Sequence, residues 1–158
     1  MSNLAIEVID AAKARGWMIA TAESCTGGMV SAALTDIAGS SAVVDRGFVT
    51  YSNAAKVKML DVSLTSLHLH GAVSETVARE MAIGALAVSD ADVTVAITGV
   101  AGPGGSDEKP EGLVHFAVAA GDYVLSNHCE FGAIGRDNVR KASVEHALKM
   151  LLTAIQDT

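Results

Sequence analysis

The chain has 158 residues, half of them apolar, which is enough for one domain with its own hydrophobic core. Its 11 basic and 18 acidic side chains give a net charge of −7, which argues against a broad nucleic-acid-binding face. The two cysteines make no disulfide framework, the N-terminus lacks signal-peptide character, and no apolar stretch is long enough to span a membrane. We therefore expect a single cytoplasmic domain over residues 1–158.

Hydrophobic periodicity predicts the elements of the first half of the chain. In order, they are a helix over residues 4–15, a strand over 17–22, a helix over 29–37, a strand over 43–51, a short polar helix over 54–60, and a link that carries His68 and His70. Gly16 is a typical stop after the first helix, and β-branched and aromatic residues favour extended structure in the second strand.

The second half is expected to contain a helix, three strands and a last helix. The helix begins after Ser74, a typical N-cap, and carries Val77, Met81, Ala85 and Val88 at helical spacing. The strands are predicted over 92–98, 113–119 and 123–130, the last two as a hairpin around Gly121-Asp122, and the last helix carries Val144, Leu148, Leu151 and Ile155 on one face. This order predicts an α/β fold in which one mixed sheet has helices on both faces.

The first candidate site is the run ESCTGG at 23–28, between a predicted strand and a predicted helix. In open α/β sheets, ligands gather at the carboxyl ends of strands, and the N–H groups at the start of the next helix can hold an oxyanion or a phosphate. Ser24 and Cys25 are adjacent candidate nucleophiles. The alternative is structural: Ser24 or Thr26 caps the helix, and Cys25 packs in the core.

A glycine-rich loop over 99–112 is the second candidate site. Its first seven residues include four glycines and a proline, which makes the loop costly in entropy to order. Loops of this length are often binding loops or lids, although the spacing matches neither the dinucleotide motif nor the P-loop. Thr98 precedes the loop and shares a crevice with Ser24 if their strands are neighbours. The alternative is a mobile surface connection.

Lys56, near the end of the strand over 43–51, is the third candidate. A lysine beside a serine acts as its general base when desolvation lowers the lysine pKa toward neutrality. Tyr51 can orient Lys56 or bind the ligand. The alternatives are a solvated lysine and a tyrosine whose ring packs in the core.

Two arginines at the start of the last helix are candidates for an anion site. Arg136 and Arg140 are four residues apart and therefore lie on one helix face. They can clamp a phosphate or a carboxylate, or they can pair with Asp137 or Glu145 on the surface.

The five histidines lack the spacing of a metal site, because no two are four residues apart and no CxxC motif accompanies them. We therefore expect no metal. Since no histidine is placed to act as a base, a pair of Ser24 and Lys56 is the favoured form of a hydrolase site.

Four motifs together resemble the CinA C-terminal domain family. They are TAESCTGG at 21–28, GFVTYSN at 47–53 with Lys56, HGAVSE at 70–75, and ITGVAGPG at 97–104 followed by EKP at 108–110 and Gly112. They occur in the family's order and span nearly the whole chain.

The resemblance implies a stand-alone, homodimeric member with a three-layer α/β/α sandwich and a mixed, mostly parallel sheet. It implies hydrolysis of the carboxamide of nicotinamide mononucleotide to nicotinate mononucleotide and ammonia, in pyridine-nucleotide salvage, without a cofactor. Matching positions make Ser24 the nucleophile and Lys56 its base, with Tyr51 and Thr98 in the amide site. The positions implied to bind the nucleotide are Cys25, Thr26, Gly27, Gly28, Gly99, Gly102, Gly104, Arg136 and Arg140.

Two features depart from the family pattern. Glu111 stands where the family has a small apolar residue, which changes the charge of the outer loop. The stretch 131–136 is longer than the family's Phe-x-Gly-Asp-Arg, so the family pattern does not decide whether Arg136 or Arg140 binds the phosphate.

Two rival functions remain open. The first is a non-catalytic nucleotide-binding module linked to competence or DNA damage, which has no need of a low-pKa lysine beside Ser24. The second keeps the enzyme and makes Cys25 the nucleophile, although no histidine is placed to activate its thiol.

Overall fold

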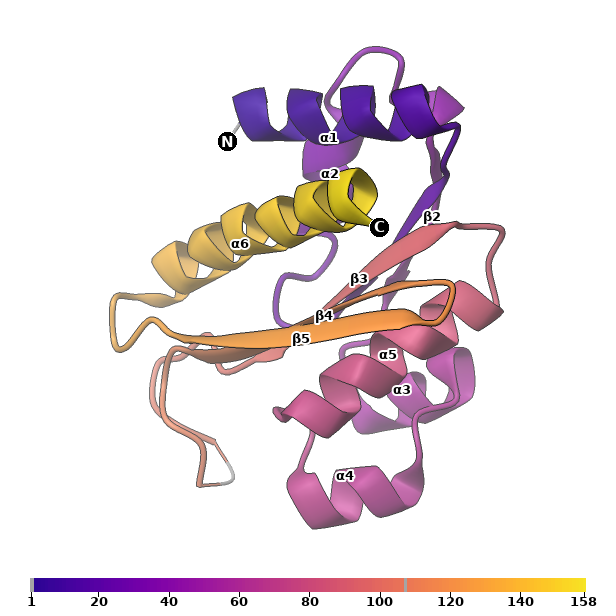
Figure 1. Cartoon of the computed structure of the whole chain (residues 1–158). Coiled ribbons are helices and arrows are strands. Elements are labelled where there is room, and N and C mark those ends of the chain that lie inside the picture. The colour runs from indigo at the N-terminus through magenta and orange to yellow at the C-terminus, as the bar shows by residue number, and fades with distance from the viewer. Residues whose placement is uncertain (1, 107) are drawn as a thin grey trace.

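The computed structural model describes residues 2–106 and 108–158, and its strands form one sheet (Figure 1). The strands are β1 (Ile19–Glu23), β2 (Val44–Val49), β3 (Val93–Gly99), β4 (Leu113–Ala120) and β5 (Tyr123–Glu130). The helices are α1 (Ser2–Arg15), α2 (Met29–Thr35), α3 (Asn53–Leu60), α4 (Leu64–His70), α5 (Glu75–Ala87) and α6 (Arg136–Asp157), with a short 3-10 turn, η1 (Ser40–Ala42), before β2.

The five-stranded sheet is mixed, with the order β2-β1-β3-β4-β5. β1 lies between β2 and β3 and is parallel to both, whereas β4 is antiparallel to β3 and to β5. The predicted hairpin at Gly121-Asp122 supplies the β4–β5 pair. The predicted mixed sheet is therefore confirmed, because only β4 runs against the direction of the other strands.

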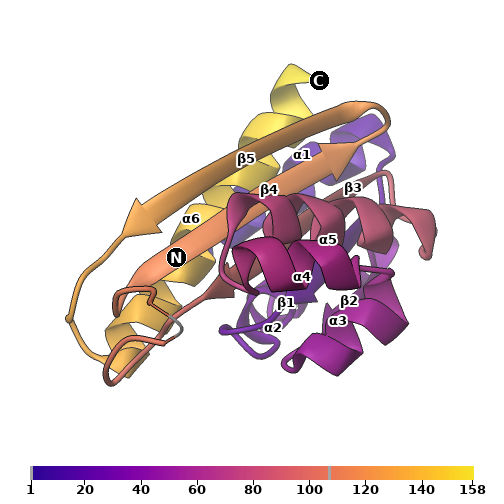
Figure 2. The ribbon, with the colours of Figure 1, turned by 90° about the horizontal axis from the view of Figure 1, so that it is seen from below.

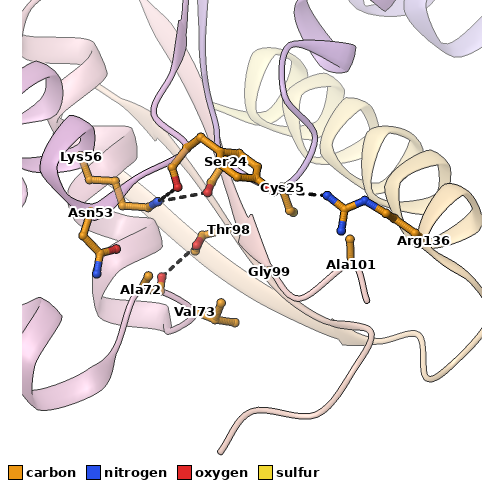
Figure 3. A pocket seen from close by; sticks show the side chains of 11 residues that line it. Ser24, Cys25, Asn53, Lys56, Ala72, Val73, Thr98, Gly99, Ala101 and Arg136 are labelled. Atoms are coloured by element: carbon orange, nitrogen blue, oxygen red, sulfur yellow. Dashed lines mark hydrogen bonds between the residues drawn. The ribbon is translucent and has the colours of Figure 1, made fainter. Parts of the chain in front are cut away.

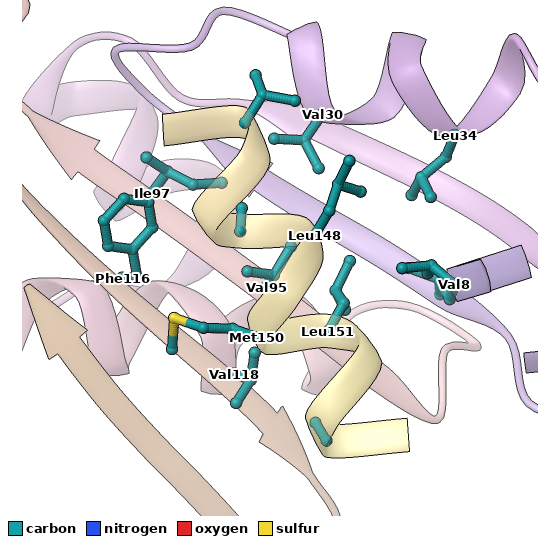
Figure 4. Close-up of a cluster of buried hydrophobic side chains, with 14 of the residues drawn as sticks. Val8, Val30, Leu34, Val95, Ile97, Phe116, Val118, Leu148, Met150 and Leu151 are labelled. Atoms are coloured by element: carbon teal, nitrogen blue, oxygen red, sulfur yellow. The ribbon is translucent and has the colours of Figure 1, made fainter. Parts of the chain in front are cut away.

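Helices cover both faces of the sheet, as predicted. Helices α1, α2 and α6 lie on one face, and α3, α4 and α5 lie on the other (Figures 1 and 2). The α6 face buries large side chains such as Val95, Phe116 and Leu148 (Figure 4). Complete burial of a side chain of this size contributes about 1.5–3 kcal/mol to stability.

The opposite face of the sheet is lined by small residues. Ala96 and Ala117 meet the α5 side, because successive strand residues point to opposite faces. These small side chains let α5 lie close to the strands. α5 also lies close to α3: a Cβ placed on Gly84 would be 1.9 Å from the carbonyl oxygen of Leu60, the last residue of α3.

One predicted element is wrong. The expected link at His68 and His70 is a helix, α4, which begins after the N-cap Ser63. None of its residues is buried, so it lacks the apolar stripe by which a helix is predicted. The predicted helix over 29–37 also ends earlier, at Thr35, and Val88 is 45% exposed rather than on the buried face of α5.

Within the described residues, no helix has both the length and the apolar character that crossing a membrane requires.

Candidate active site

The predicted site residues converge at the carboxyl ends of three neighbouring strands. Ser24 follows β1, Thr98 lies near the end of β3, and Tyr51 follows β2. Together with Lys56 of α3, they line a cavity of about 160 Å³, which Figure 3 shows from close by. The expectation that Thr98 and Ser24 share a crevice is met because β1 and β3 are neighbours.

Lys56 reaches Ser24 from the first turn of α3. Its Nζ lies 3.0 Å from the Oγ of Ser24 (Figure 3), and also 2.9 Å and 3.3 Å from the carbonyl oxygens of Thr50 and Tyr51. The side chain of Ser52 accepts the N–H of Ala55 and so caps the helix that carries Lys56. Lys56 is only 1% exposed, so the alternative of a solvated lysine is wrong.

The surroundings of Lys56 favour its neutral form. Among the described residues, no carboxylate lies within ion-pair distance of its Nζ. Burial therefore lowers the pKa of Lys56 from its ordinary value of 10.5 to about 8. A substantial fraction of the amine is neutral in mildly alkaline solution, and a neutral amine can accept a proton.

The turn over residues 24–28, which we call the Ser24 turn, is fixed by a buried carboxylate. Glu23 is 1% exposed and accepts hydrogen bonds from the hydroxyl of Thr26 and from the N–H groups of Val30 and Ser31, at 2.7, 2.9 and 3.0 Å. A carboxylate at a helix N-terminus is stabilised by the helix dipole. Glu23 thus takes the capping role that the structural alternative assigned to Ser24 or Thr26.

The sequence pattern does not single out Glu23 as a site residue. The signal available is a carboxylate between an apolar strand and a helix whose own N-cap, Gly28, has no side chain to accept a hydrogen bond.

Three N–H groups of the Ser24 turn have no oxygen acceptor within the part of the chain that the structure describes: those of Cys25, Thr26 and Gly28. The N–H of Ser24 donates to the carbonyl of Ile97 on β3 at 2.9 Å, and the N–H of Gly27 donates to the carbonyl of Ser24 at 3.1 Å. Of the three backbone N–H groups over Cys25–Gly27, that of Gly27 closes the turn, so only those of Cys25 and Thr26 lack an oxygen acceptor among the described residues.

Cys25 sits in an environment that keeps its thiol protonated. It is 6% exposed, and burial raises the pKa of its thiol to about 12. Because the thiolate is the reactive form, this environment favours Ser24 over Cys25 as the nucleophile.

Thr98 and Tyr51 occupy different parts of the site. The hydroxyl of Thr98 is buried and donates to the carbonyl of Ala72 at 2.8 Å, which fixes the wall of the cavity next to Val73 (Figure 3). Tyr51 is 63% exposed, and its hydroxyl accepts a hydrogen bond from Arg136 at 3.2 Å. The ring of Tyr51 therefore lies at the rim, and only its backbone carbonyl contacts Lys56.

A second cavity of about 260 Å³ continues from the first along the glycine-rich loop. The two share Tyr51, Val73, Gly99, Ala101 and Arg136, and the second also includes Gly102 and Gly104. The side chain of Arg136 donates to the carbonyl of Gly102 at 2.6 Å, and that of Glu111 accepts the N–H of Gly104, also at 2.6 Å. The loop is therefore tied to α6 and to Glu111 rather than free.

The remaining predicted binding residues lie behind the cavities. Thr26, Gly27, Gly28 and Arg140 line neither of the two. The guanidinium of Arg140 donates to the backbone carbonyls of Cys25 and Thr26. Within residues 2–106 and 108–158, no three histidine, cysteine or acidic side chains are grouped so as to hold a metal ion.

Known proteins resemble this chain over nearly its whole length. The model of the CinA C-terminal domain matches residues 1–155. Nicotinamide-nucleotide amidohydrolase PncC of Escherichia coli K12 is 52% identical over 154 residues, which cover 96% of this chain and 92% of that protein. A protein of the same name from Enterobacter agglomerans is 50% identical and covers 99% and 94% of the two chains.

Solved structures agree with the sequence comparison. The competence/damage inducible protein of Agrobacterium tumefaciens has a TM-score of 0.95 and 52% identity, with 99% of this chain and 95% of that chain covered. A competence damage-inducible protein of Klebsiella pneumoniae has a TM-score of 0.94 and 40% identity, with coverages of 99% and 97%. The chain therefore belongs to the CinA C-terminal domain family, as its four motifs predict.

Proposed function

We propose that this protein hydrolyses the carboxamide of nicotinamide mononucleotide to nicotinate mononucleotide and ammonia, with Ser24 as nucleophile and Lys56 as base. The observation that carries the proposal is the 3.0 Å contact between the hydroxyl of Ser24 and the buried amine of Lys56, which has no carboxylate partner among the described residues. The name of the E. coli and Enterobacter relatives, nicotinamide-nucleotide amidohydrolase, supports the choice of substrate.

The hydrogen bonds of Lys56 suit a base that cycles between two protonation states. A neutral amine has two N–H groups and one lone pair. The carbonyls of Thr50 and Tyr51 accept the two N–H groups, which leaves the lone pair for the hydroxyl proton of Ser24. After the transfer, the ammonium has three donors for the same three oxygen atoms. Neither state leaves a buried donor without a partner.

The reaction then proceeds in two halves. The Oγ of Ser24 attacks the carboxamide carbon as Lys56 takes the hydroxyl proton, and a tetrahedral oxyanion forms. Lys56 returns that proton to the leaving nitrogen, the carbon–nitrogen bond breaks, and ammonia departs from a seryl ester. In the second half, Lys56 takes a proton from a water molecule that attacks the ester, and the same proton restores Ser24 as the acid is released.

The N–H group of Cys25, which lines the cavity beside Ser24, has no oxygen acceptor among the described residues. We assign the binding of the oxyanion to Cys25, since a preorganised backbone donor typically contributes about 3–4 kcal/mol to the stability of the transition state. Thr98 shapes the amide pocket through its bond to Ala72, and Tyr51 borders the entrance.

The phosphate of the substrate is assigned to the second cavity. Arg136 lines both cavities and is exposed, so its guanidinium can exchange the carbonyl of Gly102 for a phosphate. Gly99, Gly102 and Gly104 give the ligand close access to the loop backbone. Binding at this distance from the amide supplies energy that positions the reacting group.

The homodimer implied by the family resemblance and the cytoplasmic location expected from the composition remain predictions. The site supports a non-catalytic binding module less well than a hydrolase, because such a module does not need a desolvated lysine held against a serine hydroxyl.

Ammonia release from nicotinamide mononucleotide tests the proposal. The wild-type chain should release ammonia, and Ser24→Ala should lose at least a hundredfold in turnover while still binding the nucleotide. Cys25→Ala should retain most of the activity, and Ser41→Ala, on an exposed residue of η1, serves as the matched control. Full activity in Ser24→Ala would exclude the serine, and a matching loss in Cys25→Ala would assign the reaction to the thiol.

A further inference from the structure

Arg140 of α6 donates hydrogen bonds to two consecutive carbonyls of the Ser24 turn. Its Nε lies 3.1 Å from the carbonyl oxygen of Cys25, and its Nη2 lies 3.3 Å from that of Thr26. A guanidinium presents its donors in a rigid plane, so one side chain fixes the directions of both carbonyls.

The direction of a carbonyl determines where the N–H of the same peptide unit points. A trans peptide unit is planar, and its N–H points opposite to its C=O. The Cys25 carbonyl points to Arg140, so the Thr26 N–H points away from α6. Helix α6 and helix α3 cover opposite faces of the sheet (Figure 1). Lys56 thus approaches Ser24 from the face opposite Arg140, whereas Thr26 is fully buried and lines neither cavity.

All three carbonyls at the start of the turn are used within the protein. The carbonyl of Ser24 accepts the N–H of Gly27, that of Cys25 accepts Arg140, and that of Thr26 accepts both Arg140 and the N–H of Met29. The N–H groups of Cys25 and Thr26, in contrast, have no oxygen acceptor among the described residues. The Thr26 carbonyl held by Arg140 belongs to the peptide unit whose N–H, on Gly27, donates to the Ser24 carbonyl, and this contact fixes the peptide unit that carries the Cys25 N–H.

Glu23 holds the same turn from its other side. Its buried carboxylate binds the Thr26 hydroxyl and the first N–H groups of α2. The peptide between Cys25 and Thr26 is thus fixed by Glu23 through the side chain and by Arg140 through the backbone. The Cys25 N–H, held by a turn fixed in this way, needs no reorganisation when charge develops on the substrate.

We propose that Arg140 is a positioning residue for the amide hydrolysis: by fixing the peptide units of the Ser24 turn it holds the Cys25 N–H in place for the oxyanion, and it does not bind the substrate phosphate. This inference rests on the proposed function and deepens it, because it divides two neighbouring arginines between two tasks. Arg136 lines both cavities, whereas Arg140 lines neither.

The first experiment measures kcat and KM of Arg140→Ala, Arg140→Lys and Arg136→Ala for nicotinamide mononucleotide and for nicotinamide riboside, which lacks the phosphate. Arg79→Ala, on α5, is the control arginine. Arg140→Ala should lower kcat about a hundredfold for both substrates, with KM within threefold of the wild-type value. Arg140→Lys should lose about tenfold, because a single ammonium cannot hold both carbonyls as a guanidinium does.

Arg136→Ala should show the opposite pattern. Its KM for the mononucleotide should rise at least tenfold, with little change for the riboside. The pH midpoint of kcat should be the same in Arg140→Ala as in the wild type, because Arg140 does not contact Lys56. If Arg140→Ala instead raises KM for the mononucleotide alone, Arg140 is a phosphate ligand and the inference is wrong.

The second experiment does not depend on the identity of the substrate. A fluorophosphonate that labels the active serine places an anionic oxygen where the oxyanion would lie, and its rate is followed by intact-protein mass spectrometry. Labelling of Ser24 should be at least thirtyfold slower in Arg140→Ala than in the wild type or Arg79→Ala, with an unchanged circular dichroism spectrum. Equal labelling rates would overturn the inference.

The two experiments separate the possible failures. If the wild type is labelled at Ser24 but releases no ammonia from the mononucleotide, the proposed substrate is wrong, and the labelling rates still decide the role of Arg140. If Ser24 of the wild type neither reacts with the probe nor supports ammonia release, both proposals are overturned.

Discussion

Lys56 Nζ lies 2.9 Å from the carbonyl oxygen of Thr50, so the segment that leaves β2 holds the amine against Ser24. The amine is held by neutral carbonyls rather than by a carboxylate, and its positive charge is therefore poorly compensated. This relationship underlies the first three predictions below.

The value of kcat/KM should rise with pH through one ionisation near 8. Burial lowers the pKa of Lys56 to about 8, and only the neutral amine can take the proton of Ser24. The measurement is kcat/KM between pH 6 and 10 with nicotinamide mononucleotide. A rate that is flat across this range, or that falls as pH rises through 8, would remove Lys56 from the role of base.

Lys56→Arg should be nearly as inactive as Lys56→Met. Arginine retains the positive charge but cannot release a proton at neutral pH, so it cannot act as a base. We expect both variants to lose at least a thousandfold in kcat. Lys56→Met should still bind the nucleotide, because the phosphate is assigned to Arg136. Near-normal turnover in Lys56→Arg would show that the position needs only a charge, and the base would have to be sought elsewhere.

Stability should depend on pH through Lys56. Its folded-state pKa of about 8 lies below the ordinary value of 10.5, so the unfolded chain binds more protons between these two pH values. The free energy of unfolding should therefore rise with pH in this window, by an amount on the order of 3 kcal/mol.

Urea unfolding at pH 7 and at pH 10.5 measures this effect when wild type and Lys56→Met are compared. The advantage of the methionine variant over the wild type should shrink by the same amount between the two pH values. Parallel pH profiles for the two proteins would mean that Lys56 titrates normally.

Glu23→Gln should damage turnover more than stability, whereas Glu23→Ala should damage both. Glutamine can still accept hydrogen bonds through one oxygen, but its amide nitrogen cannot accept the N–H of Ser31 or the N–H of Val30. We expect a loss of about 1–3 kcal/mol in the free energy of unfolding for the alanine variant, which leaves buried donors without a partner. If Glu23→Ala retains both the unfolding midpoint and the kcat of the wild type, the prediction is wrong and the carboxylate does not hold the Ser24 turn.

Most of the fold could be predicted because its strands and long helices carry clear apolar patterns. β3, β4 and α6 show them plainly, and the buried residues of α6 include the four expected on its inner face. Helix α4 could not be predicted in this way, since none of its residues is fully buried, only Leu67 packs partly against the core, and the helix depends on the cap at Ser63 and on contacts with α5.

The site was less accessible to sequence reasoning. Ser24 could be proposed from its place after a strand, but the burial of Lys56 could not, because α3 has almost no amphipathic pattern to indicate its inner face. The partners of Arg140 lie more than a hundred residues away in sequence, so nothing local distinguishes this arginine from Arg136. Burial and long-range contacts depend on tertiary packing, which periodicity within a single element does not describe.

Gly84 lies outside the cavity, yet its contact with α3 affects the position of Lys56. Helix α3 carries Lys56 at one end and touches Gly84 of α5 at the other, where a methyl group would meet the carbonyl of Leu60 at 1.9 Å. A larger residue at Gly84 would force the two helices apart and tilt α3, and the 3.0 Å contact with Ser24 would lengthen. Glycine at position 84 therefore permits the close helix packing that sets the distance between base and nucleophile. Attempts to evolve or redesign this enzyme should leave Gly84 unchanged.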